Sequence, residues 1–143
     1  ASHSAICRGR GEIIEPVSVP QCLHFVVVRP QSGLSTAEVY RHCRVGSHSK
    51  NQVEQLVSNL ASGQFHALSS LMLNDLQAPA EKLNSDILIL KDYFSKQSVL
   101  GHMMSGSGTA YFGVCQNRAQ ASQIAARLRS TVKGHVFVVQ NRL

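Results

Sequence analysis

The chain has 143 residues, a hydrophobic fraction of 43% and a formal net charge of +6. These values fit one folded domain and argue against disorder, and no apolar run approaches the roughly 20 residues needed to span a membrane. The basic balance suits an anionic partner such as a nucleotide, a phosphorylated metabolite or a nucleic acid, but the charges are dispersed and a solvated surface explains most of them.

Apolar runs rich in valine and aromatic residues predict four strands. The first, in "CLHFVVVRP", ends at Pro30 and has the nearly continuous apolar character of a buried strand. The others are "VLGHMMS", "TAYFGVC" and "GHVFVVQ", at residues 99–105, 109–115 and 134–140. The N-terminal stretch "ICRGRGEIIEPV" is expected to be extended, with breaks at Gly9 and Gly11.

Two helix starts carry a capping-box pattern, in which a serine is followed three residues later by Glu or Gln. Ser35 and Glu38 predict a helix in "STAEVYRHC", and Ser49 with Gln52 predicts a second helix. The second helix has an apolar stripe at helical spacing, formed by Val53, Leu56, Val57 and Leu60.

Two further helices are expected toward the C-terminus. Ser85 precedes one of them, and Asn117 can cap the other, which would end near a C-terminal glycine at Gly134. Between them and the earlier helices, residues 65–83 are apolar but irregular, with a break expected near Pro79. The apolar helix positions are Ile87, Leu90 and Phe94 in one helix, and Ala121, Ile124, Ala125, Leu128 and Val132 in the other.

The order of these elements predicts an α+β fold. A strand, several helices, two strands, a helix and a last strand suggest a ferredoxin-like sandwich with extra helices inserted in the first crossover. The short connection between residues 105 and 109 makes the two middle strands an antiparallel hairpin.

No metal site is predicted. The four cysteines form no CxxC pair, and none lies beside a histidine at metal-ligand spacing, which favours free thiols in a reducing cytosol. The seven histidines are scattered singly, and His24 and His135 open apolar runs as strand-end residues do.

The stretch "MMSGSGTAYFGV" contains a candidate phosphate-contacting loop. Glycines one residue apart can aim successive backbone N–H groups into one concavity, yet a plain hairpin turn uses glycine for purely conformational reasons. No Gly-Lys-Ser/Thr follows and no helix begins there, which excludes a Walker loop and a dinucleotide fingerprint. The loop residues are Ser105, Gly106, Ser107, Gly108 and Thr109.

"MSGSGTAYFGV" resembles the third motif of the GHMP kinase superfamily. Three further stretches, "AICRGRGEIIEPV", "VVVRPQSGLSTAEVY" and "LMLNDLQAPA", resemble in order one branch of that superfamily. That branch transfers the γ-phosphoryl of ATP to a hydroxyl of a cytidine diphosphate substrate in the non-mevalonate route of isoprenoid biosynthesis. The ordered set of motifs is much more specific than the glycine loop alone.

The resemblance implies that the chain is the C-terminal, substrate-binding part of a bacterial cytoplasmic kinase that uses ATP and Mg²⁺. Residues 1–20 would be the junction from an N-terminal domain, and residues 21–143 the C-terminal domain. In such kinases the ATP loop, the catalytic aspartate and the catalytic lysine lie in the N-terminal domain, and nothing in this chain resembles them. We therefore assign no catalytic residue, expect no activity from this part alone, and expect the N-terminal domain as its partner, with no nucleic acid and no membrane.

The resemblance also assigns residue roles. Thr36, Ala37 and Tyr40 fall where the branch has residues beside the cytidine, and an aromatic ring at Tyr40 could stack on the base. Ala37 departs from the proline of some members, and ordinary helix packing remains the alternative for Tyr40. The five residues of the glycine loop would support the phosphate-binding loop of the other domain.

The other residues of these motifs are expected to be structural. We expect Asp75 to have a structural role, because Asp and Asn also cap helices. We expect Arg8 and Arg10 to lie on a strand that crosses between domains, with Glu12 as the partner of one of these arginines rather than a general base.

Two other classes of function remain open. The basic charge and the strand order also fit a ferredoxin-like nucleic-acid-binding module, but Tyr111 and Phe112 are adjacent and so should point to opposite faces of the sheet. A small regulatory domain that binds a metabolite would share the same topology.

Overall fold

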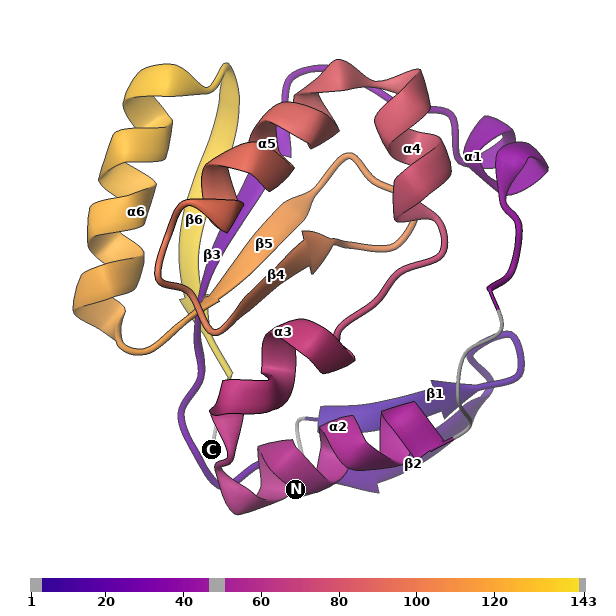
Figure 1. The fold of residues 1–143 in the computed structure, drawn as a ribbon, viewed down its shortest axis with the longest axis vertical. Coiled ribbons are helices and arrows are strands. Elements are labelled where there is room, and N and C mark those ends of the chain that lie inside the picture. Colours follow the sequence, from indigo (N-terminus) through magenta and orange to yellow (C-terminus); the bar gives the residue numbers. More distant parts are fainter. Residues whose placement is uncertain (1–3, 47–50, 142–143) are drawn as a thin grey trace.

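The computed structural model describes residues 4–46 and 51–141. The chain forms a two-stranded sheet, a four-stranded sheet and several helices (Figure 1). The strands are β1 Ser4–Arg8, β2 Ile13–Val17, β3 His24–Pro30, β4 Gly101–Met104, β5 Tyr111–Cys115 and β6 Gly134–Gln140. The helices are α1 Thr36–His42, α2 Asn51–Ser62, α3 Leu68–Leu71, α4 Gln77–Leu83, α5 Ser85–Ser95 and α6 Arg118–Thr131, with a 3-10 turn at Phe65–Ala67. No described helix is long and apolar enough to cross a membrane.

The larger sheet has the strand order β4-β5-β3-β6, and all its neighbouring strands are antiparallel. In its centre, Val26 of β3 lies opposite Gly113 of β5 on one side and Val138 of β6 on the other. This is the strand order of a ferredoxin-like sandwich, with α1 to α5 inserted between the first two strands of the motif. The predicted α+β fold and the predicted β4–β5 hairpin are therefore confirmed.

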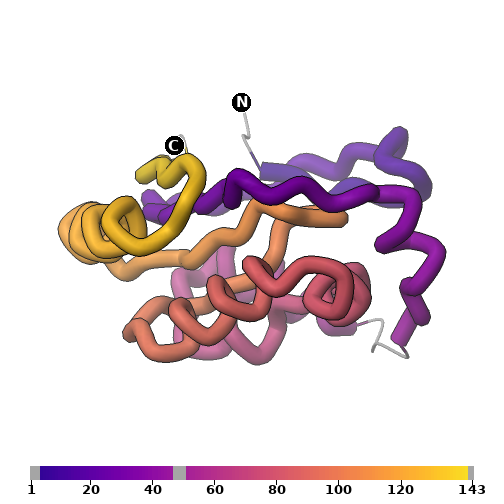
Figure 2. The backbone as a smooth tube through the Cα atoms, turned by 90° about the horizontal axis from the view of Figure 1, so that it is seen from above, coloured from indigo at the N-terminus to yellow at the C-terminus, as the bar shows by residue number. Residues whose placement is uncertain are grey.

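One face of this sheet carries the main core, under α5 and α6. Figure 2 shows α4 and α5 as a layer on one side of the strands. Because side chains alternate along a strand, Tyr111, Gly113 and Cys115 of β5 all face this layer. Full burial of a side chain such as Leu90 or Phe94 contributes roughly 1.5–3 kcal/mol. The core also contains Val26, Val28, Val39, Ile87, Met104, Ala121, Ile124, Ala125 and Leu128.

The other face of the sheet carries a second, smaller core. Phe112 of β5 packs edge-on against Phe25 of β3, with ring centroids 6.2 Å apart. Since Tyr111 is fully buried on the first face, the expected opposite orientation of the two adjacent rings is confirmed. Tyr111 is fully buried and Phe112 is partly buried against Phe25, so neither ring is freely exposed on an open sheet face for stacking nucleic-acid bases.

The predicted apolar stripe of α2 faces the second core. A cavity of about 390 Å³ lies between α2, β1 and this face of the sheet, and its lining is almost entirely apolar. Ser49, the expected cap of this helix, lies outside the described residues. The stripe residues Val53, Leu56, Val57 and Leu60 all line the cavity.

The N-terminal stretch is extended with a break at Gly9 and Gly11, as predicted, and at this break it folds back on itself. That it crosses between domains stays a prediction. β1 and β2 form an antiparallel pair, and the turn between them contains Gly9 at a φ of 67°. Arg8 forms an ion pair of 2.9 Å with Glu15, whereas the Glu12 carboxylate accepts a hydrogen bond from the backbone N–H of Arg10. Glu12 is therefore a partner of Arg10, as expected, and the contact is made through the backbone of Arg10. The domain boundary at residue 20 stays a prediction.

The ends of the helices confirm two predicted caps and correct two other expectations. Ser35 Oγ accepts from the Glu38 N–H at 3.4 Å, and Asn117 Oδ1 accepts from the Gln120 N–H at 2.9 Å. Pro79 does not interrupt a helix. It lies in the first turn of α4, where the backbone N–H groups have no helical hydrogen-bond partner to lose. Gly134 does not end α6 but begins β6, where an added Cβ would lie 2.3 Å from the Arg29 carbonyl oxygen.

Candidate functional site

The glycine loop connects β4 and β5 in a tight turn. The Ser105 N–H donates to the Ala110 carbonyl at 2.8 Å, and the Gly108 N–H donates to the Ser105 carbonyl at 3.1 Å. Gly106 and Gly108 have φ values of 57° and 91°, which side chains with a Cβ rarely adopt. Ser105 and Gly106 are exposed, so the tip of the loop is open to a ligand.

Helix α1 touches this loop. The hydroxyl of Thr36, in the first turn of α1, lies 2.9 Å from the hydroxyl of Ser107. Two residues further along the loop, the Thr109 hydroxyl donates to the Ser32 carbonyl at 3.2 Å. Val39 is fully buried and fixes α1 to the core. The structure therefore brings together two of the segments that the sequence marked, although 71 residues separate Thr36 from Ser107.

The other marked residues of α1 face solvent. Ala37 is exposed, and the Tyr40 side chain is 61% exposed, one helical turn beyond Thr36. A ring that is this exposed contributes little to helix packing, so packing alone does not account for Tyr40. The glycine loop contacts the first turn of α1 at Thr36, and the exposed Tyr40 ring projects from the next turn of this helix.

A polar hollow of about 660 Å³ lies at the C-terminal end of α1, beside α4. Four basic side chains line it, and the only carboxylate in its described lining is that of Asp75. An excess of positive charge in a concave site favours an anionic ligand. The basic residues are Arg41, His42, Arg44 and Lys82.

Asn74 holds the glycine loop from behind, a role that the sequence did not assign. Its side-chain amide donates to the Met104 carbonyl at 2.9 Å and to the Gly106 carbonyl at 2.8 Å. Its oxygen accepts from the Leu76 N–H at 3.0 Å. The resemblance had marked the Asn-Asp-Leu segment, but the sequence offers no signal for which of its side chains contacts the loop.

Asp75 lies beside the segment that follows α1. Its carboxylate accepts from the Gly46 N–H at 3.4 Å, and the Cys43 thiol lies 3.7 Å from its carbonyl oxygen. These contacts tie α1 to the start of α4, as a structural residue would. Within the described residues, no group of three or more His, Cys, Asp or Glu side chains could hold a metal ion.

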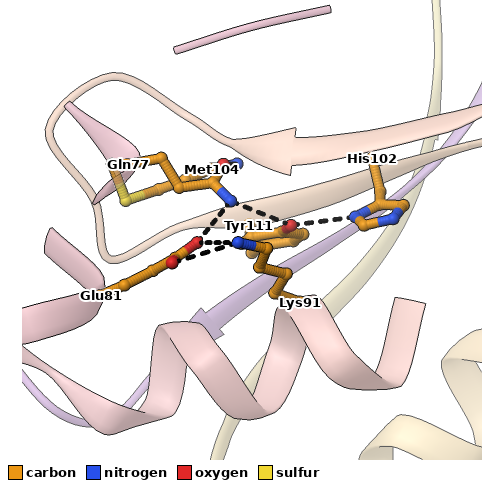
Figure 3. Close-up of polar contacts among 6 residues, drawn as sticks. All are labelled: Gln77, Glu81, Lys91, His102, Met104 and Tyr111. Carbon is orange, nitrogen blue, oxygen red and sulfur yellow. Dashed lines mark hydrogen bonds and ion pairs between the residues drawn. The ribbon is translucent and has the colours of Figure 1, made fainter. Parts of the chain in front are cut away.

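A half-buried polar network lies next to the loop, between α4, α5 and the sheet (Figure 3). The Tyr111 hydroxyl lies 2.9 Å from Nδ1 of His102, and both rings pack against Phe94. Burial raises the pKa of Tyr111 to about 12. Burial also lowers the pKa of His102, and the nearby positive charge of Lys91 adds to this effect. Both groups are therefore neutral at physiological pH.

The lowered pKa of His102 predicts that acid destabilises the fold. Below the ordinary histidine pKa of about 6.5, the unfolded chain binds a proton that the folded chain resists, so the free energy of unfolding falls as the pH is lowered. His102→Gln is expected to make the stability less dependent on pH between 7 and 5, measured by urea unfolding. The exposed His66, replaced by Gln, is the matched control for the loss of one imidazole. An unchanged pH dependence in His102→Gln would contradict the prediction.

Comparisons with known proteins define the class. The family model "GHMP kinases C terminal" matches residues 56–134, more than half of the chain. The chain therefore belongs to the GHMP kinase C-terminal family, which confirms the resemblance found in the sequence.

Two curated relatives carry the same enzyme name. The chain is 36% identical over 132 residues to 4-diphosphocytidyl-2-C-methyl-D-erythritol kinase of Desulfitobacterium hafniense, which covers 91% of the chain and 45% of the relative. It is 33% identical over 129 residues to the enzyme of the same name from Pelotomaculum thermopropionicum, covering 90% and 45%. The chain thus spans less than half the length of these two relatives.

Solved structures agree on the fold. A crystal structure of 4-(cytidine 5'-diphospho)-2C-methyl-D-erythritol kinase matches with a TM-score of 0.77 and 27% identity, covering 97% of this chain and 50% of that chain. Homoserine kinase from Cytophaga hutchinsonii matches with a TM-score of 0.79 at 17% identity, covering 96% of this chain and 49% of that chain. At 17% identity, the similarity to homoserine kinase supports the fold alone.

Proposed function

We propose that this chain is the substrate-binding C-terminal part of a kinase that phosphorylates 4-diphosphocytidyl-2-C-methyl-D-erythritol with ATP. The kinase names of its relatives support this assignment. The observation that carries it is the contact between the hydroxyls of Thr36 and Ser107, which joins the helix marked for cytidine to the loop marked for phosphates. Residues 1–20 would lead in from an N-terminal domain, and residues 21–143 would form this one.

Each part of the site has a role in this proposal. The exposed Tyr40 ring stacks on the cytosine, with Thr36 and Ala37 beside it on α1. The basic hollow beside α1 attracts the negatively charged substrate, since it presents four cationic or titratable side chains and one carboxylate. The residues of this chain bind and orient the substrate and do not transfer protons.

The glycine loop meets the phosphates from this side. Within the described residues, the N–H groups of Gly106 and Ser107 have no hydrogen-bond partner in the protein; Gly106 is exposed and Ser107 is partly buried. Such N–H groups suit a phosphate oxygen of bound ATP or support the loop that holds it. When bound, ATP would supply the phosphoryl group, and Mg²⁺ would supply positive charge against the negative charge that develops on it. The ligands for that metal would come from the N-terminal domain.

A direct assay tests the proposal. The whole protein that contains this chain is expected to transfer phosphate from ATP to 4-diphosphocytidyl-2-C-methyl-D-erythritol, while the chain alone transfers none. A folded whole protein with no ATP-dependent phosphorylation of this compound would overturn the assignment.

Replacing Tyr40 by alanine is expected to weaken binding of the substrate. Stacking of a base on an aromatic ring contributes about 1–3 kcal/mol, so KM for the cytidine substrate should rise roughly 5- to 150-fold, with KM for ATP unchanged. Tyr40→Phe keeps the ring and should behave like the wild type. Steady-state kinetics of the three proteins checks this, and equal KM values in Tyr40→Ala and Tyr40→Phe would remove Tyr40 from the site.

A further inference from the structure

Strand β4, which leads into the glycine loop, lies at the edge of the sheet. Met104 is its last residue and pairs with Tyr111 on the inner side. Backbone N–H and C=O groups that point outward from an edge strand have no strand partner, so they need other partners when the residue is buried. Met104 is fully buried, so the position of the loop depends on what satisfies its outward groups.

Two side-chain amides from one neighbouring segment satisfy both groups. The Met104 N–H donates to Gln77 Oε1 at 2.9 Å, and the Met104 carbonyl accepts from Asn74 Nδ2 at 2.9 Å. The same Asn74 amide donates to the carbonyl of Gly106, inside the loop, at 2.8 Å. Asn74 and Gln77, which we call the amide clamp, therefore fix the loop at its base and at its first glycine.

The surroundings of Gln77 allow only one orientation of its amide. Its nitrogen donates to the Glu81 carboxylate at 2.9 Å, so its oxygen must face the Met104 N–H (Figure 3). Lys91 of α5 forms an ion pair of 2.9 Å with that carboxylate, whose side chain is only 13% exposed. The Gln77 nitrogen also lies 3.4 Å from the Tyr111 hydroxyl. Contacts from α4, α5 and β5 thus hold the clamp in place.

We propose that Asn74 and Gln77 are positioning residues that set the glycine loop against its phosphate ligand. The position of the loop follows from the contacts alone, whereas its effect on catalysis rests on the proposed function. The two residues touch no substrate in this scheme and act only through the backbone of Met104 and Gly106.

The first experiment needs no kinase activity. In Gln77→Glu the side chain keeps its size but loses the N–H group that faces Glu81, so two carboxylates meet and the clamp opens. Amide exchange of Met104, followed by NMR on this chain at neutral pH, is expected to become about fivefold faster or more. The amide resonances of residues 105–109 are expected to shift. Gln123→Glu adds the same charge on the exposed face of α6 and should change neither the amide exchange of Met104 nor the resonances of the loop.

A reciprocal variant separates the clamp from a general loss of stability. Gln77→Glu combined with Glu81→Gln exchanges donor and acceptor without changing the net charge of the pair, and is expected to restore both slow exchange and the loop resonances. Loop resonances and Met104 exchange that stay at their wild-type values in both Gln77→Glu and Asn74→Ala would overturn the clamp.

The second experiment tests the effect on catalysis in the whole protein. Gln77→Glu is expected to lower kcat roughly tenfold, with KM for the cytidine substrate nearly unchanged, and the reciprocal variant should recover it. A shifted loop with a normal kcat would overturn the positioning role. A wild-type protein that does not phosphorylate the substrate would instead overturn the proposed function, and the NMR result would still decide whether the clamp exists.

Discussion

Gly113→Ala is expected to destabilise the protein by about 3 kcal/mol, through overpacking of the core. Gly113 lies in the middle of β5, directly beneath the ring of Phe94 on α5. A Cβ added at Gly113 would lie 2.5 Å from Cε1 and 2.7 Å from Cδ1 of that ring. Phe94 cannot move aside freely, because its ring is fully buried and stacked against Tyr111 and His102, with centroid distances of 5.6 and 6.0 Å.

Urea unfolding at constant m-value measures this loss. Gly33→Ala is the matched control, because nothing lies within 4 Å of its added Cβ and its φ is ordinary; its stability should stay within about 0.5 kcal/mol of the wild type. Adding Phe94→Leu to Gly113→Ala should make the two losses less than additive, since the smaller side chain leaves room for the methyl group. A Gly113→Ala protein as stable as the control would show that α5 can shift away from the sheet at little cost.

The sequence predicted the sheet well because the relevant signals are local. Four apolar runs marked the strands, and side-chain alternation predicted that the Tyr111 and Phe112 rings point to opposite faces. The caps at Ser35 and Asn117 could also be predicted from the sequence, because each capping side chain lies only three residues before the N–H group from which it accepts.

The errors arose where distant parts of the chain decide the role of a residue. Gly134 follows a helix and so looked like its terminal glycine, but the close approach of the Arg29 carbonyl in β3 requires a glycine there. The sequence did not indicate why residue 113 is a glycine. The Phe94 ring, which leaves no room for a side chain at this position, lies 19 residues earlier and on another element. Glu12 contacts one of the two expected arginines, Arg10, but the sequence did not reveal that the contact is made through the backbone N–H.

The candidate site was only partly visible for the same reason. The resemblance marked α1 and the glycine loop separately, and their contact through Thr36 and Ser107 depends on the three-dimensional fold. Asn74 and Gln77 contact the loop across about 30 residues of sequence, and amide side chains follow no periodic pattern that would reveal it. A sequence motif can therefore mark a segment, but the geometry has to show which side chain in the segment makes the contact.

Gly108→Ala is expected to lower kcat of the whole protein roughly 100-fold, since a displacement of about 1 Å in a positioning loop can cost this much. The backbone of Gly108 has a φ of 91°, and an added Cβ would lie 2.9 Å from the sulfur of Met104 and 3.3 Å from Cδ2 of Leu34. Both the strained backbone and these close contacts are expected to displace the loop from its present position. The unfolding free energy should fall by about 1–3 kcal/mol as well.

The decisive comparison is with Gly106→Asn, in the same loop. Gly106 has a φ of 57°, which asparagine tolerates, and nothing lies within 4 Å of its added Cβ, so this variant should lose less than about 1 kcal/mol of stability. The value of kcat per folded molecule distinguishes a loop that is only a turn from a loop that positions phosphates. If the loop is only a turn, Gly108→Ala reduces stability but each folded molecule keeps its activity. If the loop positions phosphates, folded Gly108→Ala molecules remain slow under conditions where both variants are fully folded.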